Sequence, residues 1–285
     1  MTDTGTVSLR PPALRTSRAG RLTAHLLLIA GAIVILMPFA WMITTSLKSQ
    51  GKVHLPPYLW PNQFEVSNYS KALESGDFAR YYFNSTIVTG AIVAAQVVLS
   101  SMAGYAFARL RFPGRGLLFA VVMATMMVPI YVTIVPRFLV IRDLGWLNSY
   151  PGLIVPQLVT PFGIFLMRQY YLSMSKSYEE AALIDGAGRV RVWWSIVVPM
   201  SAPVMAVVGI FGFLFAWNDF LWPLVVITDD RMRTVQLGLA MFSGRYGTQW
   251  TLLAAGSLVA TLPALVAFLI AQRWLIRGIT LGDLK

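Results

Sequence analysis

The sequence of 285 residues contains no cysteine and only two histidines, His25 and His54. The lack of cysteine excludes disulfides, thiolate metal sites and a cysteine nucleophile, and two histidines so far apart argue against a histidine metal site. Charged residues are also scarce, at 12% of the chain, whereas soluble globular chains carry about 25%. An ordinary soluble enzyme is therefore not expected. Disorder is excluded because it requires low hydrophobicity and high charge.

Apolar residues, by contrast, make up 56% of the chain, and its mean hydropathy is +0.64. A helix of roughly 20 apolar residues spans a bilayer core. Six stretches have this character: 22–45, 83–107, 117–139, 151–171, 203–226 and 251–272. Because these runs are long and do not alternate with period two, helices are favoured. We predict an all-α integral membrane protein with six transmembrane helices, in which Pro129, Pro156 and Pro161 kink the third and fourth.

The N-terminal region admits two interpretations. Residues 1–21 form a basic tail before a transmembrane domain at 22–285, but a basic segment before an apolar run is also how a signal peptide begins. This apolar run is longer than the ~7–15 residues of a signal core, and Ala40-Trp41-Met42 is a poor cleavage site. An uncleaved anchor is favoured over a removed signal.

Basic residues exceed acidic ones, which gives a formal net charge of +11. Arg109, Arg111 and Arg115 crowd the short turn between the second and third stretches, and short loops weigh most in the positive-inside rule. Both termini are therefore predicted to be cytoplasmic. Topology and anionic membrane lipid account for the basic excess, so no nucleic-acid partner is expected.

The inner segment 172–202 is too polar to span a membrane, yet its sequence has the features of helices rather than of an irregular loop. Ser177 and Glu180 have the spacing of a capping box at the start of a helix. Asp185-Gly186 is typical of a helix end, because glycine accepts the left-handed conformation. The pattern predicts two short helices in this segment.

The spacing within this segment resembles the EAA loop of binding-protein-dependent ABC importer permeases. The matching residues are Glu180-Ala181-Ala182, then Gly186 after three residues, Ile196 after nine more, and Pro199 after two more. Val198 departs from the leucine that usually precedes the proline. The loop would lie on the cytoplasmic side, before the fifth of six spans.

Other motifs are similar to the carbohydrate-uptake branch of this family, and to its maltose-type subunit with six helices. They are Phe112-Pro113-Gly114, Trp217-Asn218-Asp219-Phe220 and Trp222-Pro223. The resemblance covers roughly residues 22–285 and implies the type I permease fold. The ending Gly278–Lys285 departs from the commoner ending of the family, so no regulatory role of the tail is carried over.

The resemblance implies a permease subunit of an ATP-driven sugar importer in a bacterial plasma (inner) membrane. Its implied partners are a second homologous permease, two copies of an ABC ATPase, and an extracytoplasmic solute-binding lipoprotein or periplasmic protein. The sequence lacks the G-x-x-x-x-G-K-[ST] phosphate loop. ATP and Mg²⁺ are thus expected on the ATPase subunits, and we expect no cofactor, metal or catalytic residue on this chain.

The chain is expected to form half of the translocation path, and its coupling segment 172–202 is expected to dock a small-residue helix on the ATPase. The residues concerned are Glu180, Ala181, Ala182, Asp185, Gly186, Ala187 and Pro199. The glutamate could serve either as the helix cap or as an ion pair with the partner. ATPase closure would then move the spans as rigid bodies between inward-open and outward-open states.

An acidic residue inside a span is costly and points to function, and Asp219 is such a residue. Sugars are bound by groups that accept hydrogen bonds from hydroxyls and by aromatic faces. The candidates for the substrate path are therefore Trp217, Asn218, Asp219 and Trp222. Alternatively, the aspartate pairs across the permease interface or satisfies kinked backbone. Arg137 and Arg168 are expected to snorkel from span ends.

The outer loop 227–250 is polar and flexible enough to reach a soluble binding protein, although a simple turn is an equal alternative. Its candidate contacts are Asp229, Asp230, Arg231 and Arg245. Two other classes of protein compete with the importer. A channel or secondary transporter would need a relay of intramembrane acids, and an intramembrane enzyme would need a catalytic pair. Within the favoured class, the solute could be sn-glycerol-3-phosphate, a polyol or another compound.

Overall fold

The structure is a computed structural model that describes residues 18–53, 60–61, 63–244 and 247–280. The regular secondary structure of the described part is helical except for one short hairpin, in which β1 (Ser243–Gly244) pairs antiparallel with β2 (Gly247–Thr248). The α-helices are α1 (Arg18–Ser46), α2 (Ser67–Glu74), α3 (Phe78–Arg109), α4 (Arg115–Thr125), α5 (Ile130–Asp143), α6 (Tyr150–Ile154), α7 (Pro161–Ser173), α8 (Ser177–Ile184), α9 (Arg189–Val192), α10 (Val198–Met200), α11 (Ala202–Trp217), α12 (Leu221–Val226), α13 (Val235–Leu239) and α14 (Trp250–Thr280). Single 3₁₀ turns are η1 (Gln50–Lys52), η2 (Val155–Gln157), η4 (Asp230–Met232) and η5 (Ala240–Phe242), and η3 (Trp193–Val197) is a π-helical turn.

Three helices are individually long and apolar enough to cross a membrane within the described ranges: Gly20–Ser46, Phe78–Arg109 and Trp250–Trp274. Three further pairs of helices reach that length only together. They bend by 100° between α4 and α5, by 41° between α6–η2 and α7, and by 77° between α9–α10 and α11. If each bent pair is one span, the described residues contain six segments long and apolar enough to cross a membrane.

The predicted stretches 117–139 and 151–171 are interrupted, and proline explains both breaks. Pro129 is extended, with φ −60° and ψ 135°, and stands at the N-terminus of α5. Pro161 is the first residue of α7 and follows the extended Thr160. A proline has no N–H to continue a helix and disfavours helical backbone in the residue before it. In the third stretch, where a kink was predicted, the helix is therefore broken, with 100° between α4 and α5.

The predicted continuous span at 203–226 is wrong. The helix α11 begins at Ala202 and ends at Trp217, and α12 begins only at Leu221. The break is at Asn218 and Asp219, both of which have short polar side chains. Such side chains compete with the backbone for hydrogen bonds and so favour helix ends. The break places the only acidic residue of this stretch at a helix terminus.

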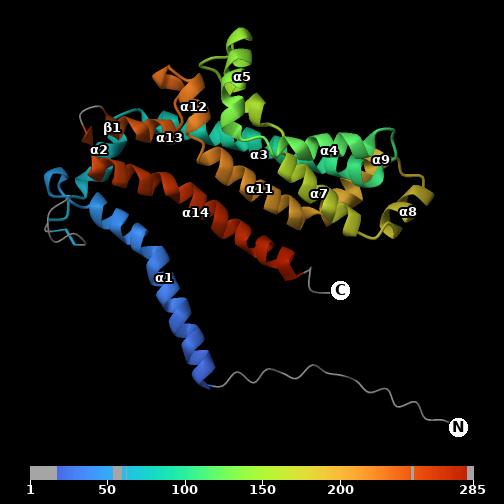
Figure 1. The fold of residues 1–285 in the computed structure, drawn as a ribbon, viewed down its shortest axis with the longest axis horizontal. Coiled ribbons are helices and arrows are strands. Elements are labelled where there is room, and N and C mark those ends of the chain that lie inside the picture. Colours follow the sequence, from blue (N-terminus) through green and yellow to red (C-terminus); the bar gives the residue numbers. More distant parts are fainter. Residues whose placement is uncertain (1–17, 54–59, 62, 245–246, 281–285) are drawn as a thin grey trace.

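The helix α3 is the centre of the packed layer and contacts both α7 and α11, while α11 also packs on α14 (Figure 1). Gly104 permits the contact between α3 and α7, because a Cβ atom there would lie 2.6 Å from Cβ of Met167. Small residues allow helices in membranes to approach this closely. In Figure 1, α8 and α9 lie at one end of the layer, and α2, α13 and the hairpin at the other.

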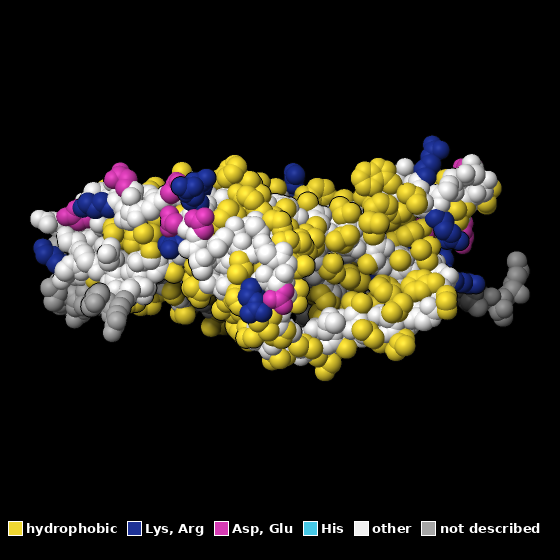
Figure 2. Space-filling view, turned by 90° about the horizontal axis from the view of Figure 1, so that it is seen from above, with side chains coloured by type: hydrophobic (Ala, Val, Ile, Leu, Met, Phe, Trp, Pro, Cys, Tyr) yellow, Lys and Arg dark blue, Asp and Glu magenta, His cyan; other side chains and the backbone are white. Residues whose placement is uncertain are grey.

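The helix α1 extends away from the other helices, and the C-terminal end of α1 contacts α14 (Figure 1). Its described residues from 20 to 40 are all exposed, although they are almost all apolar. The face seen in Figure 2 is likewise hydrophobic across its middle, and most charged side chains lie toward the two ends. This distribution suits a protein whose middle faces lipid and whose ends face water. Of the predicted basic tail at 1–21, residues 1–17 lie outside the described part.

Candidate functional site

A cavity of about 910 Å³ lies where the broken helices meet. Polar side chains reach it from α3, α5, η2 and the break after α11, and aromatic side chains come from α7, α11 and α12. The lining residues that matter most are Gln96, Arg137, Gln157, Asp219, Phe162, Phe211, Phe215 and Trp222. The volume lies within the roughly 300–1,000 Å³ that is usual for small-molecule sites.

Asp219 occupies the break between α11 and α12, and its two carboxylate oxygens have separate partners. Oδ1 accepts a hydrogen bond from the backbone N–H of Trp222 at 3.2 Å. Oδ2 accepts one from Nε2 of Gln157 at 3.0 Å. The first bond satisfies an N–H at the start of α12, which otherwise has no partner within that helix. The carboxylate is thereby fixed at the wall of the cavity.

Arg137 also lines this cavity, so the prediction that it snorkels away from a span end is wrong. Its guanidinium lies 4.7 Å from the ring centroid of Trp222, and Nη2 donates to the carbonyl of Pro156 at 3.1 Å. It interacts electrostatically with Asp219. The bend of 100° after α4 turns α5 so that this side chain faces inward. Arg168 likewise packs over a ring, 4.1 Å from the centroid of Phe119.

Two glutamines complete the polar wall. Nε2 of Gln96 donates to the carbonyl of Gln157 at 2.8 Å and so ties α3 to η2. Gln157 is 8% exposed, and its Oε1 has no hydrogen-bond partner among the described residues. Sequence reasoning missed both residues, although an amide within an apolar stretch is itself a signal, since buried polar groups need partners.

The four predicted residues of the substrate path separate into two pairs. Asp219 and Trp222 line the cavity, whereas Trp217 and Asn218 do not. Trp217 is buried against α14, where Nε1 donates to the carbonyl of Ala260 at 3.0 Å. Asn218 is exposed and bonds back to its own helix, at the carbonyl of Leu214.

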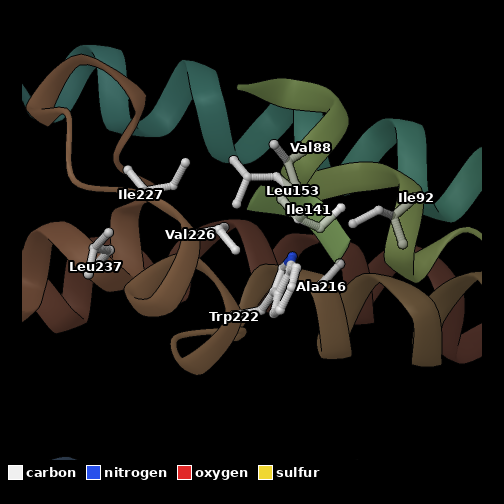
Figure 3. Close-up of a cluster of buried hydrophobic side chains, with 9 residues drawn as sticks. All are labelled: Val88, Ile92, Ile141, Leu153, Ala216, Trp222, Val226, Ile227 and Leu237. Atoms are coloured by element: carbon white, nitrogen blue, oxygen red, sulfur yellow. The ribbon is translucent and has the colours of Figure 1, made fainter. Parts of the chain in front are cut away.

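The indole of Trp222 belongs partly to the core beside the cavity. Figure 3 shows it among Val226, Ile141 and Leu153. Its Nε1 donates to the carbonyl of Gly152 at 2.9 Å. Its ring therefore forms a rigid floor under Arg137, because packing and a hydrogen bond both fix its orientation.

The helix α8 of the coupling segment ends as the sequence predicts. Gly186 has a left-handed φ of +83°, its N–H donates to the carbonyl of Leu183 at 3.1 Å, and the N–H of Ala187 donates to the carbonyl of Ala182 at 2.9 Å. This pair of bonds is a Schellman motif, and it fixes the turn at Asp185 and Gly186. Pro199 lies in α10, just before the 77° bend into α11.

The predicted capping box at the start of α8 does not form. The N-cap is Lys176, one residue earlier than predicted, and no side chain caps it. Ser177 already belongs to the helix, and its hydroxyl pairs with that of Ser175 at 2.7 Å. Glu180 is exposed at the surface. Of the two functions considered for it, capping is therefore wrong, and its carboxylate points to solvent.

The preceding residue, Glu179, is the buried acid of this segment, and sequence reasoning missed it. Its Oε1 lies 2.7 Å from Nε of Arg109, with 10% and 5% of the two side chains exposed. Its Oε2 accepts from the hydroxyl of Tyr105 at 3.1 Å, and Nη2 of Arg109 donates to the carbonyl of Met174 at 2.8 Å. The C-terminal end of α3 therefore holds α8 through a buried ion pair and a charge-assisted hydrogen bond from Tyr105. No motif signals this pairing, since the two residues are 70 positions apart.

The segment around η4 is held in place by hydrogen bonds to α3. The amide of Asn84 on α3 donates to the carbonyls of Arg231 and Arg233, at 2.9 and 2.8 Å. The hydroxyl of Tyr81 on α3 donates to Asp230 at 2.8 Å, and Asp229 accepts from the N–H of Arg231 at 2.9 Å. Arg245 lies outside the described residues. The loop is thus attached to the N-terminal end of α3, the same helix that holds α8 at its C-terminal end.

No group of three or more histidine, aspartate or glutamate residues able to hold a metal ion occurs in the described part of the chain. The cavity, by contrast, presents a few donors and acceptors to a small molecule within a mainly apolar lining. The chain thus combines apolar helices, a mainly apolar cavity with a few polar groups at the helix breaks, and a short exposed helix at one end.

Residues 96–280 match the protein family described as binding-protein-dependent transport system inner membrane component. The chain is 32% identical over 266 residues to the diacetylchitobiose uptake system permease protein NgcG of Streptomyces coelicolor, which covers 92% of this chain and 88% of that protein. It is 33% identical over 264 residues to the sn-glycerol-3-phosphate transport system permease protein UgpE of Yersinia enterocolitica, which covers 90% and 94%.

Two solved structures share the fold. A bacterial ABC transporter involved in the import of the acidic polysaccharide alginate matches with a TM-score of 0.80 at 24% identity, over 93% of this chain and 99% of that one. The alginate transporter in complex with its alginate pentasaccharide-bound periplasmic protein matches with a TM-score of 0.63 at 16% identity, over 89% and 93%. These likenesses confirm the predicted type I permease fold. The chain belongs to the family of inner-membrane components of binding-protein-dependent transport systems, which are the ABC importer permeases that the spacing from Glu180 to Pro199 predicts.

Proposed function

We propose that this chain is the permease subunit of an ATP-driven sugar importer and forms half of its translocation path. The observation that carries this proposal is the cavity at the helix breaks, where Asp219, Gln157 and Arg137 face a space walled by aromatic rings. A sugar presents hydroxyls to such polar groups and a C–H face to such rings. The relative NgcG supports a sugar as solute. The relative UgpE supports the alternative, in which the same architecture imports glycerol-3-phosphate, a polyol or another compound.

The proposed importer pairs this chain with a second homologous permease, two copies of an ABC ATPase, and an extracytoplasmic solute-binding lipoprotein or periplasmic protein. ATP and Mg²⁺ belong to the ATPase subunits, and this chain contributes no catalytic group. The complex of the alginate transporter with a periplasmic protein supports a partner of that kind. The exposed apolar surface of α1 supports contact with lipid or with the second permease, because an apolar face of this length needs a cover.

In this proposal, α8 is the element that docks on the ATPase. Its exposed apolar side chains support this role, and Ile184 is 86% exposed. The coupling residues Ala181, Ala182 and Ala187 permit close approach, and the turn at Asp185 and Gly186 sets the direction of the chain. Glu180 offers its exposed carboxylate to a basic residue of the ATPase, and Pro199 stiffens the chain before α11.

The helix α3 then transmits motion between the two faces. It has 32 residues and is about 48 Å long at 1.5 Å per residue. Arg109 at its inner end holds α8, Gln96 in its middle lines the cavity, and Asn84 at its outer end holds the loop around η4. A rigid helix with these three attachments moves all three together, which is the geometry of alternating access.

The proposed topology is that of a multi-pass protein of a bacterial plasma membrane, with six membrane-crossing segments and both termini in the cytoplasm. Residues 172–202 then form the cytoplasmic coupling loop. The outer loop presents Asp229, Asp230, Arg231 and Arg245 to the binding protein. The arginines that follow α3 support this orientation.

The test is affinity purification of the tagged chain from native membranes, with quantitative mass spectrometry. The proposal predicts one second permease and two ATPase copies for each copy of this chain. Reconstituted in proteoliposomes with its binding protein, the complex should accumulate solute only when ATP is supplied. Recovery of a homo-oligomer, or uptake that persists without ATP, contradicts the proposal and favours a channel or secondary transporter.

A further inference from the structure

Arg137 and Asp219 carry opposite charges on one cavity, yet no direct ion pair joins them in the described structure. Both are anchored to the same short segment, through the carbonyl of Pro156 and the amide of Gln157. Both also contact Trp222, one at its ring and the other at its backbone N–H. The two charged groups are thus held by separate partners while both line the same cavity.

Both groups keep hydrogen-bonding capacity that the protein does not use. A guanidinium has five N–H donors, and the structure shows one hydrogen bond from Arg137. A carboxylate has about four acceptor sites, and Asp219 accepts the two bonds described above. Beside them, Oε1 of the buried Gln157 has no hydrogen-bond partner within the part of the chain that the structure describes. Buried polar groups are normally paired, so Oε1 of Gln157 needs a donor, and an acceptor is needed to use the remaining N–H groups of Arg137.

A hydroxyl group meets both requirements, because it donates one hydrogen bond and accepts others. It donates to Asp219 or Gln157 and accepts from Arg137. An ionised phosphate only accepts, and the carboxylate of Asp219 opposes it because like charges repel strongly where water is scarce. The facing edge-to-face rings of Phe162 and Phe211, with centroids 5.7 Å apart, provide an apolar wall for the C–H face of a sugar ring.

We propose that Arg137 and Asp219 form a charge-balanced hydroxyl-binding subsite, through which this subunit itself selects neutral polyhydroxylated solutes over phosphorylated ones. The inference rests on the proposed transport function and adds to it. It assigns solute contacts to this chain, and it makes Asp219 the residue that rejects anions. Of the two solutes named by the relatives, it favours the neutral glycoside over the phosphate ester.

The experiment compares each sugar with its own phosphate ester, which adds an anionic group to the same carbohydrate framework. The probes are radiolabelled diacetylchitobiose, maltose, cellobiose and trehalose, each with its 6-phosphate. Binding is measured by scintillation proximity on the purified permease–ATPase complex in nanodiscs, without the binding protein. In the wild type, we expect at least one neutral sugar to bind about tenfold more tightly than its phosphate, a ratio equivalent to 1.4 kcal/mol.

Two variants shift this ratio in opposite directions, which loss of folding cannot do. Asp219→Asn removes the negative charge and keeps Arg137. In this variant the phosphate ester should bind as tightly as the neutral sugar, or more tightly. Arg137→Gln removes the positive charge and keeps Asp219. In this variant both ligands should bind more weakly, and the preference for the neutral sugar should increase. Asp143→Asn, on the exposed end of α5 and away from the cavity, is the matched control and should leave the ratio unchanged.

The inference is overturned if the wild type binds a phosphate as tightly as its neutral partner, if no probe binds, or if Asp219→Asn leaves the ratio unchanged. Uptake by the complete system in proteoliposomes separates this failure from that of the proposed function. ATP-dependent uptake of a sugar with an unchanged ratio rejects the subsite alone. Absence of ATP-dependent uptake of every solute in the panel rejects the proposed function as well.

Discussion

Nε of Arg109 and Oε1 of Glu179 lie 2.7 Å apart, and both side chains are almost fully buried. One is the last residue of α3, and the other lies in the first turn of α8. Breaking a buried ion pair is costly because the remaining charge stays buried without compensation. This pair therefore joins the exposed coupling helix to the longest helix of the packed layer.

We expect Glu179→Gln to destabilise the protein by about 3–5 kcal/mol, the usual cost of removing one partner of a buried pair. Glu180→Gln changes the same residue type one position later, but at the surface, and should change stability by less than about 0.5 kcal/mol. Thermal unfolding of the two variants in detergent measures the difference. Equal stability of both variants would contradict the assignment of the buried acid.

The turn after α8 depends on the left-handed backbone of Gly186. Gly186→Ala should destabilise the segment by about 1–2 kcal/mol, the cost of a Cβ in that conformation. Gly188→Ala is the control, because Gly188 has a φ of −71° and open space around it. Protease cleavage of the coupling segment should accelerate in the first variant alone. Identical cleavage of both would show that the glycine conformation does not hold the turn.

Close packing of α3 on α7 depends on Gly104, where a Cβ would lie 2.6 Å from Cβ of Met167. Gly104→Ala should cost about 1–3 kcal/mol, as overpacking usually does. Gly90 lies on the same helix with nothing within 4 Å of a built Cβ, so Gly90→Ala should be tolerated. Melting temperatures of the assembled complex report the difference, and a larger loss in Gly90→Ala would contradict this packing.

Local features of the chain were predictable wherever the physical cause lies within a few residues. Gly186 ends a helix because of its own backbone freedom, and Pro129 breaks one because it lacks an N–H. The capping box failed because Lys176 took the N-cap position, and boundaries of this kind shift by a residue or two with tertiary context. The all-α fold class was predictable from the long apolar stretches, because their length and lack of period-two alternation are also local properties of the sequence.

The parts that were missed depend on contacts between distant elements. Glu179 and Arg109 are unremarkable in sequence, and only the packing of α8 on α3 brings them together. Arg137 was expected at a span end, but the bend before α5 turns it onto Trp222. Trp217 and Asp219 are neighbours in one motif, yet the helix break sends the tryptophan to α14 and the acid to the cavity.

The central claim is that α8 is the docking element for the ATPase, and the absence of cysteine from the sequence makes a direct test possible. A single cysteine in place of Ile184, labelled with benzophenone-maleimide, gives one photo-crosslinking site in the purified complex. We predict a covalent adduct with the ATPase subunit, whereas the same label at Asp143→Cys should give none. An adduct from position 143 but not from 184 would contradict the account.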